Sequence, residues 1–281
     1  MGRPIALIAG EGALPLAVLS ACEAEGRPVT VCGVRGHDGD LPRNDRPLRL
    51  ETIGSLIAGL KADGIAEVCF CGAVQRPQID PTAIDAATAP LVERMIGAVS
   101  AGGDDAALRV AVALFEEAGL HVAGAAEVAP GLLPPDGVPT AARPSDAHGA
   151  DAGRGAATVA ALGAADIGQA CIVRAGQVIA VEALPGTDWM LASLAEVPPV
   201  LRPPHDRGGV LYKAPKPGQD RRVDLPTIGP KTVEGAAAAG LDGVAIEAGG
   251  VMVLDLPATV AAADAAGLFL WVRSPAAARP G

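Results

Sequence analysis

Apolar residues in the first 72 positions form short runs that alternate with segments of helical periodicity. Ile5–Ala9, Pro28–Val34 and Glu67–Cys71 are short and apolar or β-branched, as expected of buried strands. Residues 16–24 and 53–62 are rich in Ala, Leu, Val and Ile at helical spacing. Because parallel strands require crossover helices of about this length, the order predicts a Rossmann-like open parallel sheet.

The pattern changes after Ala129–Pro139, a stretch dense in Pro and Gly that predicts a domain boundary. Before it, a helical stretch over 89–118 is interrupted at 100–105, and after it the residues up to Arg154 are expected to be irregular. Further elements are then predicted: helices at 156–165, 232–239 and 257–266, a hairpin over 169–184 turning at Ala175–Gly176, and strands at 210–213, 243–248 and 251–255. We therefore expect an α/β protein with a Rossmann-like N-terminal domain over 1–132 and a C-terminal mixed α/β domain over 133–281.

Composition narrows the class of protein. The net charge is −10, from 32 acidic and 22 basic residues, which disfavours nucleic acid as a partner. The five cysteines show no disulfide spacing, and Cys69 and Cys71 lack two further ligands at zinc spacing. The cysteine pattern fits a reducing cytoplasm, so we expect a cytoplasmic protein. No apolar run approaches the roughly 20 residues of a membrane span, so any contact with a membrane is expected to be peripheral.

A glycine-containing turn follows the first predicted strand. It begins like the dinucleotide fingerprint, but Pro15 stands where the third glycine belongs, which weakens the case for NAD. Backbone N–H groups at a strand-to-helix turn suit an anion such as a diphosphate. Gly10, Gly12, Ala13 and Leu14 are thus candidate anion contacts, and a purely structural turn is the alternative.

Carboxylates in two further turns are candidate chemistry. Asp104 and Asp105 follow two glycines, where they could bind a divalent cation or cap a helix. Glu182 and Asp188 flank a Pro-Gly-Thr turn, where they could bind a metal, act as a general base or cap a helix.

The most informative segment runs from Lys213 to Gly229. Between Lys213 and Asp224 it carries four basic side chains, two carboxylates and an amide, in a backbone stiffened by Pro215 and Pro217. The four histidines are scattered without ligand spacing. Carboxylates and cations therefore favour phosphoryl or pyrophosphate transfer over acyl transfer.

Several of these motifs together resemble those of the LpxI-type UDP-2,3-diacylglucosamine pyrophosphatases of lipid A biosynthesis. The matching segments are Leu7–Pro15, Gly103–Asp105, Asp166–Gln169, Val181–Glu182, Gly186–Asp188, Lys216–Arg222, Asp224–Gly229, Ala239–Leu241 and Glu247–Gly249. Lys216–Gly229 is the most specific of them.

The resemblance implies a substrate held between the two domains and hydrolysis of UDP-2,3-diacylglucosamine to UMP and 2,3-diacylglucosamine 1-phosphate (lipid X), with Mg²⁺ or another divalent cation. It implies Asp224 as the essential carboxylate, with Asp188 and Glu182 as further catalytic candidates. Candidate metal ligands are Asp104, Asp105, Asp220 and Asp224. Candidate substrate contacts are Gly10, Gly12, Ala13, Leu14, Thr187, Lys213, Lys216, Gln219, Arg222 and Thr227.

The resemblance also implies a homodimer and peripheral contact with the cytoplasmic face of the inner membrane, where an apolar cleft would take the acyl chains. Two alternatives are a nucleotide-sugar binding or regulatory protein without turnover and a Rossmann oxidoreductase. Binding of NAD(H) would favour the oxidoreductase. Carboxylates beside a diphosphate favour a metal-dependent hydrolase over a simple binding protein.

Overall fold

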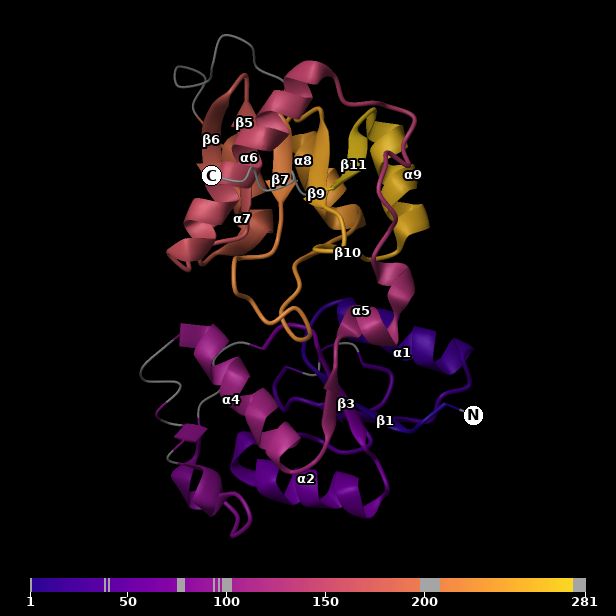
Figure 1. Cartoon of the computed structure of the whole chain (residues 1–281), viewed down its shortest axis with the longest axis vertical. Helices are drawn as coiled ribbons and strands as arrows, with labels where there is room; N and C mark the ends of the chain where they lie inside the picture. The colour runs from indigo at the N-terminus through magenta and orange to yellow at the C-terminus, as the bar shows by residue number, and fades with distance from the viewer. Residues whose placement is uncertain are drawn as a thin grey trace, which may run out of the picture. The chain divides into compact units, whose positions relative to one another are not determined.

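The chain forms two compact units, each described here by itself. Unit 1 comprises Met1–Pro130 with Arg222–Asp224, and unit 2 comprises Gly131–Arg221 with Leu225–Gly281. The sequence-based boundary between residues 132 and 133 stays a prediction. The computed structural model (Figure 1) describes residues 2–37, 39, 41–74, 79–92, 94, 95, 97, 103–197 and 208–274, without the side chains of 103–107 and 195.

Unit 1 contains a parallel sheet with the strand order β2-β1-β3-β4. The strands are β1 (Ile5–Ala9), β2 (Val29–Gly33), β3 (Glu67–Cys71) and β4 (His121–Ala123). All five residues of β1 are buried, as expected of a strand covered on both faces. The three strands predicted from the apolar runs are confirmed, whereas β4 has only three residues and gave no clear pattern.

Helices cover both faces of this sheet. They are α1 (Leu14–Ala24), α2 (Ile53–Ala62), α4 (Gly103–Glu117) and the short α5 (Ala125–Val128), with 3₁₀ turns at Leu50–Thr52, Pro81–Ala83 and Ala89–Leu91. Helix α1 packs against β1, β2 and β3, while α2 and α4 contribute to the apolar cluster of the opposite face. The predicted helix at 53–62 is confirmed residue for residue.

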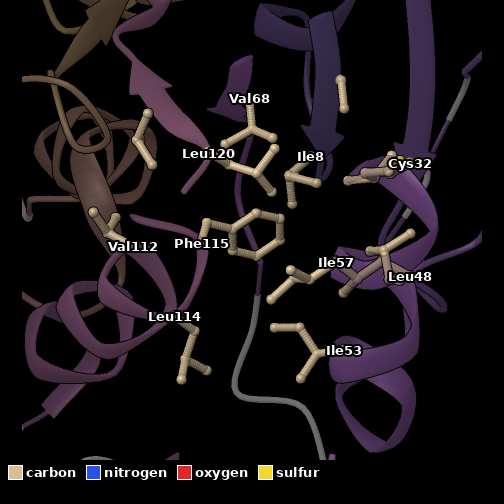
Figure 2. Packing of buried hydrophobic residues seen from close by; sticks show 14 of the residues in the cluster. Ile8, Cys32, Leu48, Ile53, Ile57, Val68, Val112, Leu114, Phe115 and Leu120 are labelled. Atoms are coloured by element: carbon tan, nitrogen blue, oxygen red, sulfur yellow. The ribbon is translucent and has the colours of Figure 1, made fainter. Parts of the chain in front are cut away.

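Phe115 of α4 lies at the centre of that cluster (Figure 2). Its ring is fully buried, and its centroid lies 5.3 Å from that of Phe70 in an edge-to-face contact. Ile8, Val68 and Leu120 surround it with aliphatic side chains. In a chain with only 2% aromatic residues, this cluster thus contains two of the three phenylalanines.

Unit 2 is built on a mixed sheet with the order β11-β9-β7-β5-β6. Its strands are β5 (Ala170–Arg174), β6 (Gln177–Val181), β7 (Val210–Lys213), β9 (Gly243–Glu247) and β11 (Phe269–Arg273), and β8 (Thr227–Ile228) pairs separately with β10 (Met252–Val253). Strand β5 is antiparallel to both β6 and β7, and β7, β9 and β11 are mutually parallel. The predicted hairpin at Ala175–Gly176 is confirmed, and the Asp151 carboxylate accepts both backbone N–H groups of that turn.

Alternation along the strands assigns the two faces of this sheet. Cys171, Val173 and Tyr212 pack against α6 (Asp146–Ala164). Ile172 and Leu211 belong to the cluster on the other face, where α7 (Gly186–Ala195), α8 (Pro230–Ala238) and α9 (Leu256–Ala266) lie. The central strands β5 and β7 therefore bury both of their faces between helices.

Helix α6 begins earlier than the sequence pattern predicts. The expectation of irregular chain up to Arg154 is wrong, because Ser145 caps a helix that starts at Asp146. Of the glycines that weaken the local helix signal, Gly155 serves packing, because a Cβ there would lie 2.6 Å from the Tyr212 Cβ. Close approach of α6 to β7 thus outweighs the low helix propensity of the segment.

Replacing Phe115 with Ala should lower the free energy of unfolding by about 3–5 kcal/mol, because a large cavity would open inside unit 1. Urea denaturation followed by circular dichroism measures the change. Leu184→Ala, at a side chain that is 94% exposed, is the control and should change the free energy by less than about 0.5 kcal/mol. Equal unfolding midpoints for the two variants would contradict this account of the core.

Candidate functional site

In unit 2, the candidate residues gather at one edge of the sheet. Strands β6, β7 and β9 run in the same direction, so their carboxyl ends lie along the same edge. Glu182 directly follows β6, Lys213 is the last residue of β7, and Glu247 is the last residue of β9. This is the edge at which open α/β sheets usually bind ligands.

Three of the predicted residues form a buried hydrogen-bonded chain. The Lys213 ammonium donates to Thr187 Oγ1 at 2.7 Å, and the Thr187 hydroxyl donates to Glu182 Oε1 at 3.0 Å. The Gln169 backbone N–H donates to the second Glu182 oxygen at 3.3 Å. The exposed fractions of Lys213, Thr187 and Glu182 are 6%, 8% and 7%. A cation and an anion are therefore joined through a hydroxyl in a nearly water-free environment.

The electrostatics of this chain are set by burial. Desolvation lowers the pKa of Lys213 below the usual lysine value, and the negative charges of Glu182 and Asp188 oppose the shift. Asp188 itself is exposed in the first turn of α7, where a carboxylate also favours the helix dipole. The two acidic residues predicted here thus stabilise the buried ammonium.

An unsatisfied acceptor lies beside this chain. The side-chain oxygen of Gln169 is buried and accepts no hydrogen bond within the described part of the chain. A buried amide oxygen without a donor is costly, so this position suits a ligand that brings an N–H or O–H group.

A cavity of about 240 Å³ lies on the opposite face of the sheet, between α6 and the loop that follows β7. Its apolar wall comes from α6 and from Tyr212, and Lys216, Gln219 and Arg221 supply its polar side. The lining residues are Ala156, Val159, Ala160, Tyr212, Ala214, Pro215, Lys216, Pro217, Gly218, Gln219, Arg221 and Glu247. The cavity could take a ligand with both apolar and anionic groups.

Internal bonds hold this loop in shape. Gln219 accepts a hydrogen bond from the Lys216 backbone at 2.9 Å, Lys216 pairs with Asp166 at 2.7 Å, and Arg221 pairs with Glu247 at 3.2 Å. Lys216 and Gln219 are candidate substrate contacts predicted from the sequence. Arg221 and Glu247 lie in segments that match the family but were not predicted as site residues, and Tyr212 was not singled out. The sequence signal for Glu247 and Tyr212 was weak, because Glu247 ends an apolar strand and Tyr212 lies within one, as core residues do.

In unit 1, the glycine turn follows β1 at the carboxyl edge of the sheet. The Gly10 and Glu11 N–H groups donate to Cys71 and Ala73, and a Cβ at Gly10 would lie 2.3 Å from the Ala73 carbonyl oxygen. Glycine is therefore required at this position for close backbone approach. The backbone N–H groups of Gly12, Ala13 and Leu14 have no acceptor among the described residues. They remain candidate anion contacts.

A histidine that the sequence analysis set aside lies at this turn. His37 Nδ1 is 3.1 Å from Glu11 Oε1, and the His37 side chain is largely buried. The pairing brings together residues 26 positions apart, which no local motif indicates.

The segment Arg222–Asp224 belongs to unit 1 by its contacts. Arg222 donates to Glu116 of α4 at 2.6 Å, and Val223 packs against the core of Figure 2. A Cβ at Gly124, which follows β4, would lie 3.2 Å from the Arg222 Cα. Asp224, the predicted essential carboxylate, is half-buried at the end of this segment.

The remaining predicted residues do not form a described cluster. Thr227 pairs with Met252 in the short β8–β10 ladder, and Asp220 lies in the loop of unit 2. Asp104 and Asp105 occupy the first turn of α4, but their side chains lie outside the described residues. Across the described ranges, no three His, Cys, Asp or Glu side chains come together as a metal-ligand set.

Comparison with known proteins places the whole chain in one family. The model of the LpxI N-terminal domain matches residues 4–132, and that of the LpxI C-terminal domain matches residues 135–271. A relative from Caulobacter vibrioides, named UDP-2,3-diacylglucosamine pyrophosphatase LpxI, is 41% identical over 271 residues. The match covers 95% of this chain and 96% of the relative.

Replacing Lys213 with Met should cost about 3–5 kcal/mol of unfolding free energy, because Glu182 would stay buried without its cation. Adding Glu182→Gln should recover part of this loss, since a neutral amide can still accept from Thr187. Urea denaturation followed by tryptophan fluorescence gives the double-mutant cycle, because both tryptophans lie in unit 2. Lys231→Met, at an exposed lysine, is the control. A coupling energy of zero would refute the interaction.

The difference in unfolding free energy between the wild type and Lys213→Met should depend on pH. The folded-state pKa of Lys213 lies below the unfolded value of 10.5. At a pH between these two pKa values, the native state therefore binds fewer protons than the unfolded state does. The penalty for the buried ammonium is present at lower pH and is relieved as pH rises through that window. The stability of the wild type relative to Lys213→Met should therefore increase toward pH 10.5. A constant or decreasing difference in urea denaturation would rule out the shift.

Proposed function

This chain belongs to the LpxI family, and on that premise we propose that it hydrolyses the pyrophosphate bond of UDP-2,3-diacylglucosamine. The observation that carries the proposal is the match, over 95% of the chain, to a relative named for this activity. The products are UMP and 2,3-diacylglucosamine 1-phosphate, and the reaction serves lipid A biosynthesis.

The chemistry requires neutralisation of the diphosphate and activation of a water molecule. Water oxygen bonds to one phosphorus, the bridging P–O bond breaks, and the water proton passes to a carboxylate. We assign the carboxylate role to Asp224. Arg222, two residues earlier in the same segment of unit 1, supplies a guanidinium suited to phosphate oxygens.

The polar edge of unit 2 supports the proposal with groups suited to the sugar phosphate. Lys216 and Arg221 present cations at a cavity with an apolar wall, and Gln169 offers a buried acceptor that a hydroxyl or amide of the sugar could satisfy. The buried Lys213–Thr187–Glu182 chain holds the start of α7 in place beneath this edge. Lys213 and Thr187 remain proposed substrate contacts, and Glu182 and Asp188 remain proposed catalytic residues.

The proposal includes a divalent cation, first of all Mg²⁺, because the resemblance to the family implies one. It would offset the charge of the diphosphate when bound. Asp104, Asp105, Asp220 and Asp224 are its proposed ligands. The proposal further includes a homodimer, a cytoplasmic location and peripheral contact with the inner membrane.

The decisive assay is UMP release from UDP-2,3-diacylglucosamine, with Mg²⁺ and with EDTA. Asp224→Ala and Asp224→Asn should each lower kcat by about 10²–10⁴-fold with substrate still bound, because the water activator is removed. Asp63→Ala, at an exposed aspartate of the same unit that pairs with Arg46, is the matched control and should retain activity.

Each outcome separates the candidate functions. Substrate binding without turnover under any cation would favour a nucleotide-sugar binding protein, and tight binding of NAD(H) would favour an oxidoreductase. Turnover that persists in EDTA would leave the hydrolase in place and remove the metal from the proposal.

A further inference from the structure

Large exposed apolar side chains are concentrated in one short stretch of unit 2. Of the five among the described residues, four lie between positions 167 and 189: Ile167 is 48% exposed, Val181 40%, Leu184 94% and Trp189 59%. The fifth is Val74 of unit 1. Single exposed apolar residues are ordinary, but a concentration of this kind marks an interaction surface.

The four residues surround one end of strand β6. Val181 is the last residue of β6, which is the edge strand of the sheet, and Trp189 lies in the first turn of α7. Leu184 lies in the turn between these elements. Ile167 precedes Gly168, whose Cβ position lies 2.2 Å from the Glu182 carbonyl oxygen, so this connection packs beside the end of β6.

The turn that carries Leu184 is anchored on both sides. Glu182 and Thr187 are buried and hydrogen-bonded to each other at 3.0 Å, and the Gly186 N–H donates to the Ala183 carbonyl at 2.8 Å. Leu184 therefore projects from a turn whose ends, Glu182 and Thr187, are buried. This nearly fully exposed leucine on an ordered turn is therefore available for contact with an apolar partner.

The chemistry of the substrate indicates what that partner is. A molecule with two acyl chains is stably anchored in a bilayer, so an enzyme that acts on it must approach the lipid surface. Among the described helices, none has the length and apolar character needed to cross a membrane. A net charge of −10 repels anionic headgroups, which leaves apolar insertion as the favourable contribution. Tryptophan beside leucine suits the boundary between headgroups and acyl chains.

On the basis of the proposed function, we propose that Leu184 and Trp189, flanked by Ile167 and Val181, form a lipid-contacting face of unit 2. This face inserts into the headgroup boundary of the bilayer that carries the diacylated substrate. It lies next to the Glu182–Thr187 pair, so lipid contact occurs beside the polar edge of the same sheet.

The test uses the full chain and vesicles without substrate. Because the chain has only two tryptophans, Trp271→Phe leaves Trp189 as the sole tryptophan, which is excited selectively at wavelengths where Tyr212 does not absorb. Vesicles of phosphatidylcholine should shift its emission to the blue, and brominated acyl chains should quench it. Co-sedimentation should weaken by at least about tenfold in Leu184→Ser/Trp189→Ser, and not in Val74→Ser. Binding should persist at high salt, and added phosphatidylglycerol should not strengthen it.

Three results would overturn the proposal: no blue shift and no sedimentation, equal weakening by Val74→Ser, or self-association of the chain that the double variant abolishes while vesicles are not bound. The last would make this face a contact between copies. UMP release from substrate in detergent micelles separates the two hypotheses. Turnover without vesicle binding rejects only the lipid-contacting face, whereas absence of turnover rejects the hydrolase.

Discussion

Parallel strands return the chain to the same edge of a sheet after every crossover, and most of the chemistry of this protein follows from that constraint. In unit 1 the edge carries the Gly10 turn and the residues that follow β4. In unit 2 it carries Glu182, Lys213 and Glu247. Side chains that are far apart in sequence are thereby brought to common edges, where each unit offers backbone N–H groups, cations or carboxylates to a ligand.

The cations at these edges are paired with acidic groups. Lys216 lies against Asp166, Arg221 against Glu247, and Arg222 against Glu116, while Thr187 links Lys213 to Glu182. Each of these basic side chains thus already has an acidic or hydroxyl partner. An anionic ligand at these edges would have to compete with the carboxylates for them.

The sequence pattern predicted the strands of unit 1, helix α2 and the β5–β6 hairpin, because each has strong local periodicity or a clear turn. It missed α7, whose Pro185–Gly186 start reads as a turn, and β11, which begins two residues after the Gly267 that ends α9. It misplaced the start of α6, where Gly149 and Gly153 weaken the helix signal and Gly155 packs against Tyr212. Tertiary packing decided these cases, and local propensity did not.

For the site, local motifs were enough to select Glu182, Thr187 and Lys213, but not to predict that they form one hydrogen-bonded chain. That contact depends on the pairing of Lys213 with Ala170 in the sheet and on the position of α7. The contact of Arg222 with Glu116 spans 106 positions and has no local cue. Long-range pairing is therefore the part of the site that a single sequence leaves undetermined.

The assignment of Arg222–Asp224 to unit 1 has a consequence for modularity. The backbone passes from one unit to the other at three points, after Pro130, after Arg221 and after Asp224. No single cut separates the two units, because a fragment ending at Pro130 lacks Val223 and the arginine that pairs with Glu116. The two halves of the gene therefore do not correspond to two independent modules. If relatives exchanged the second half, residues 222–224 of unit 1 would be exchanged together with unit 2.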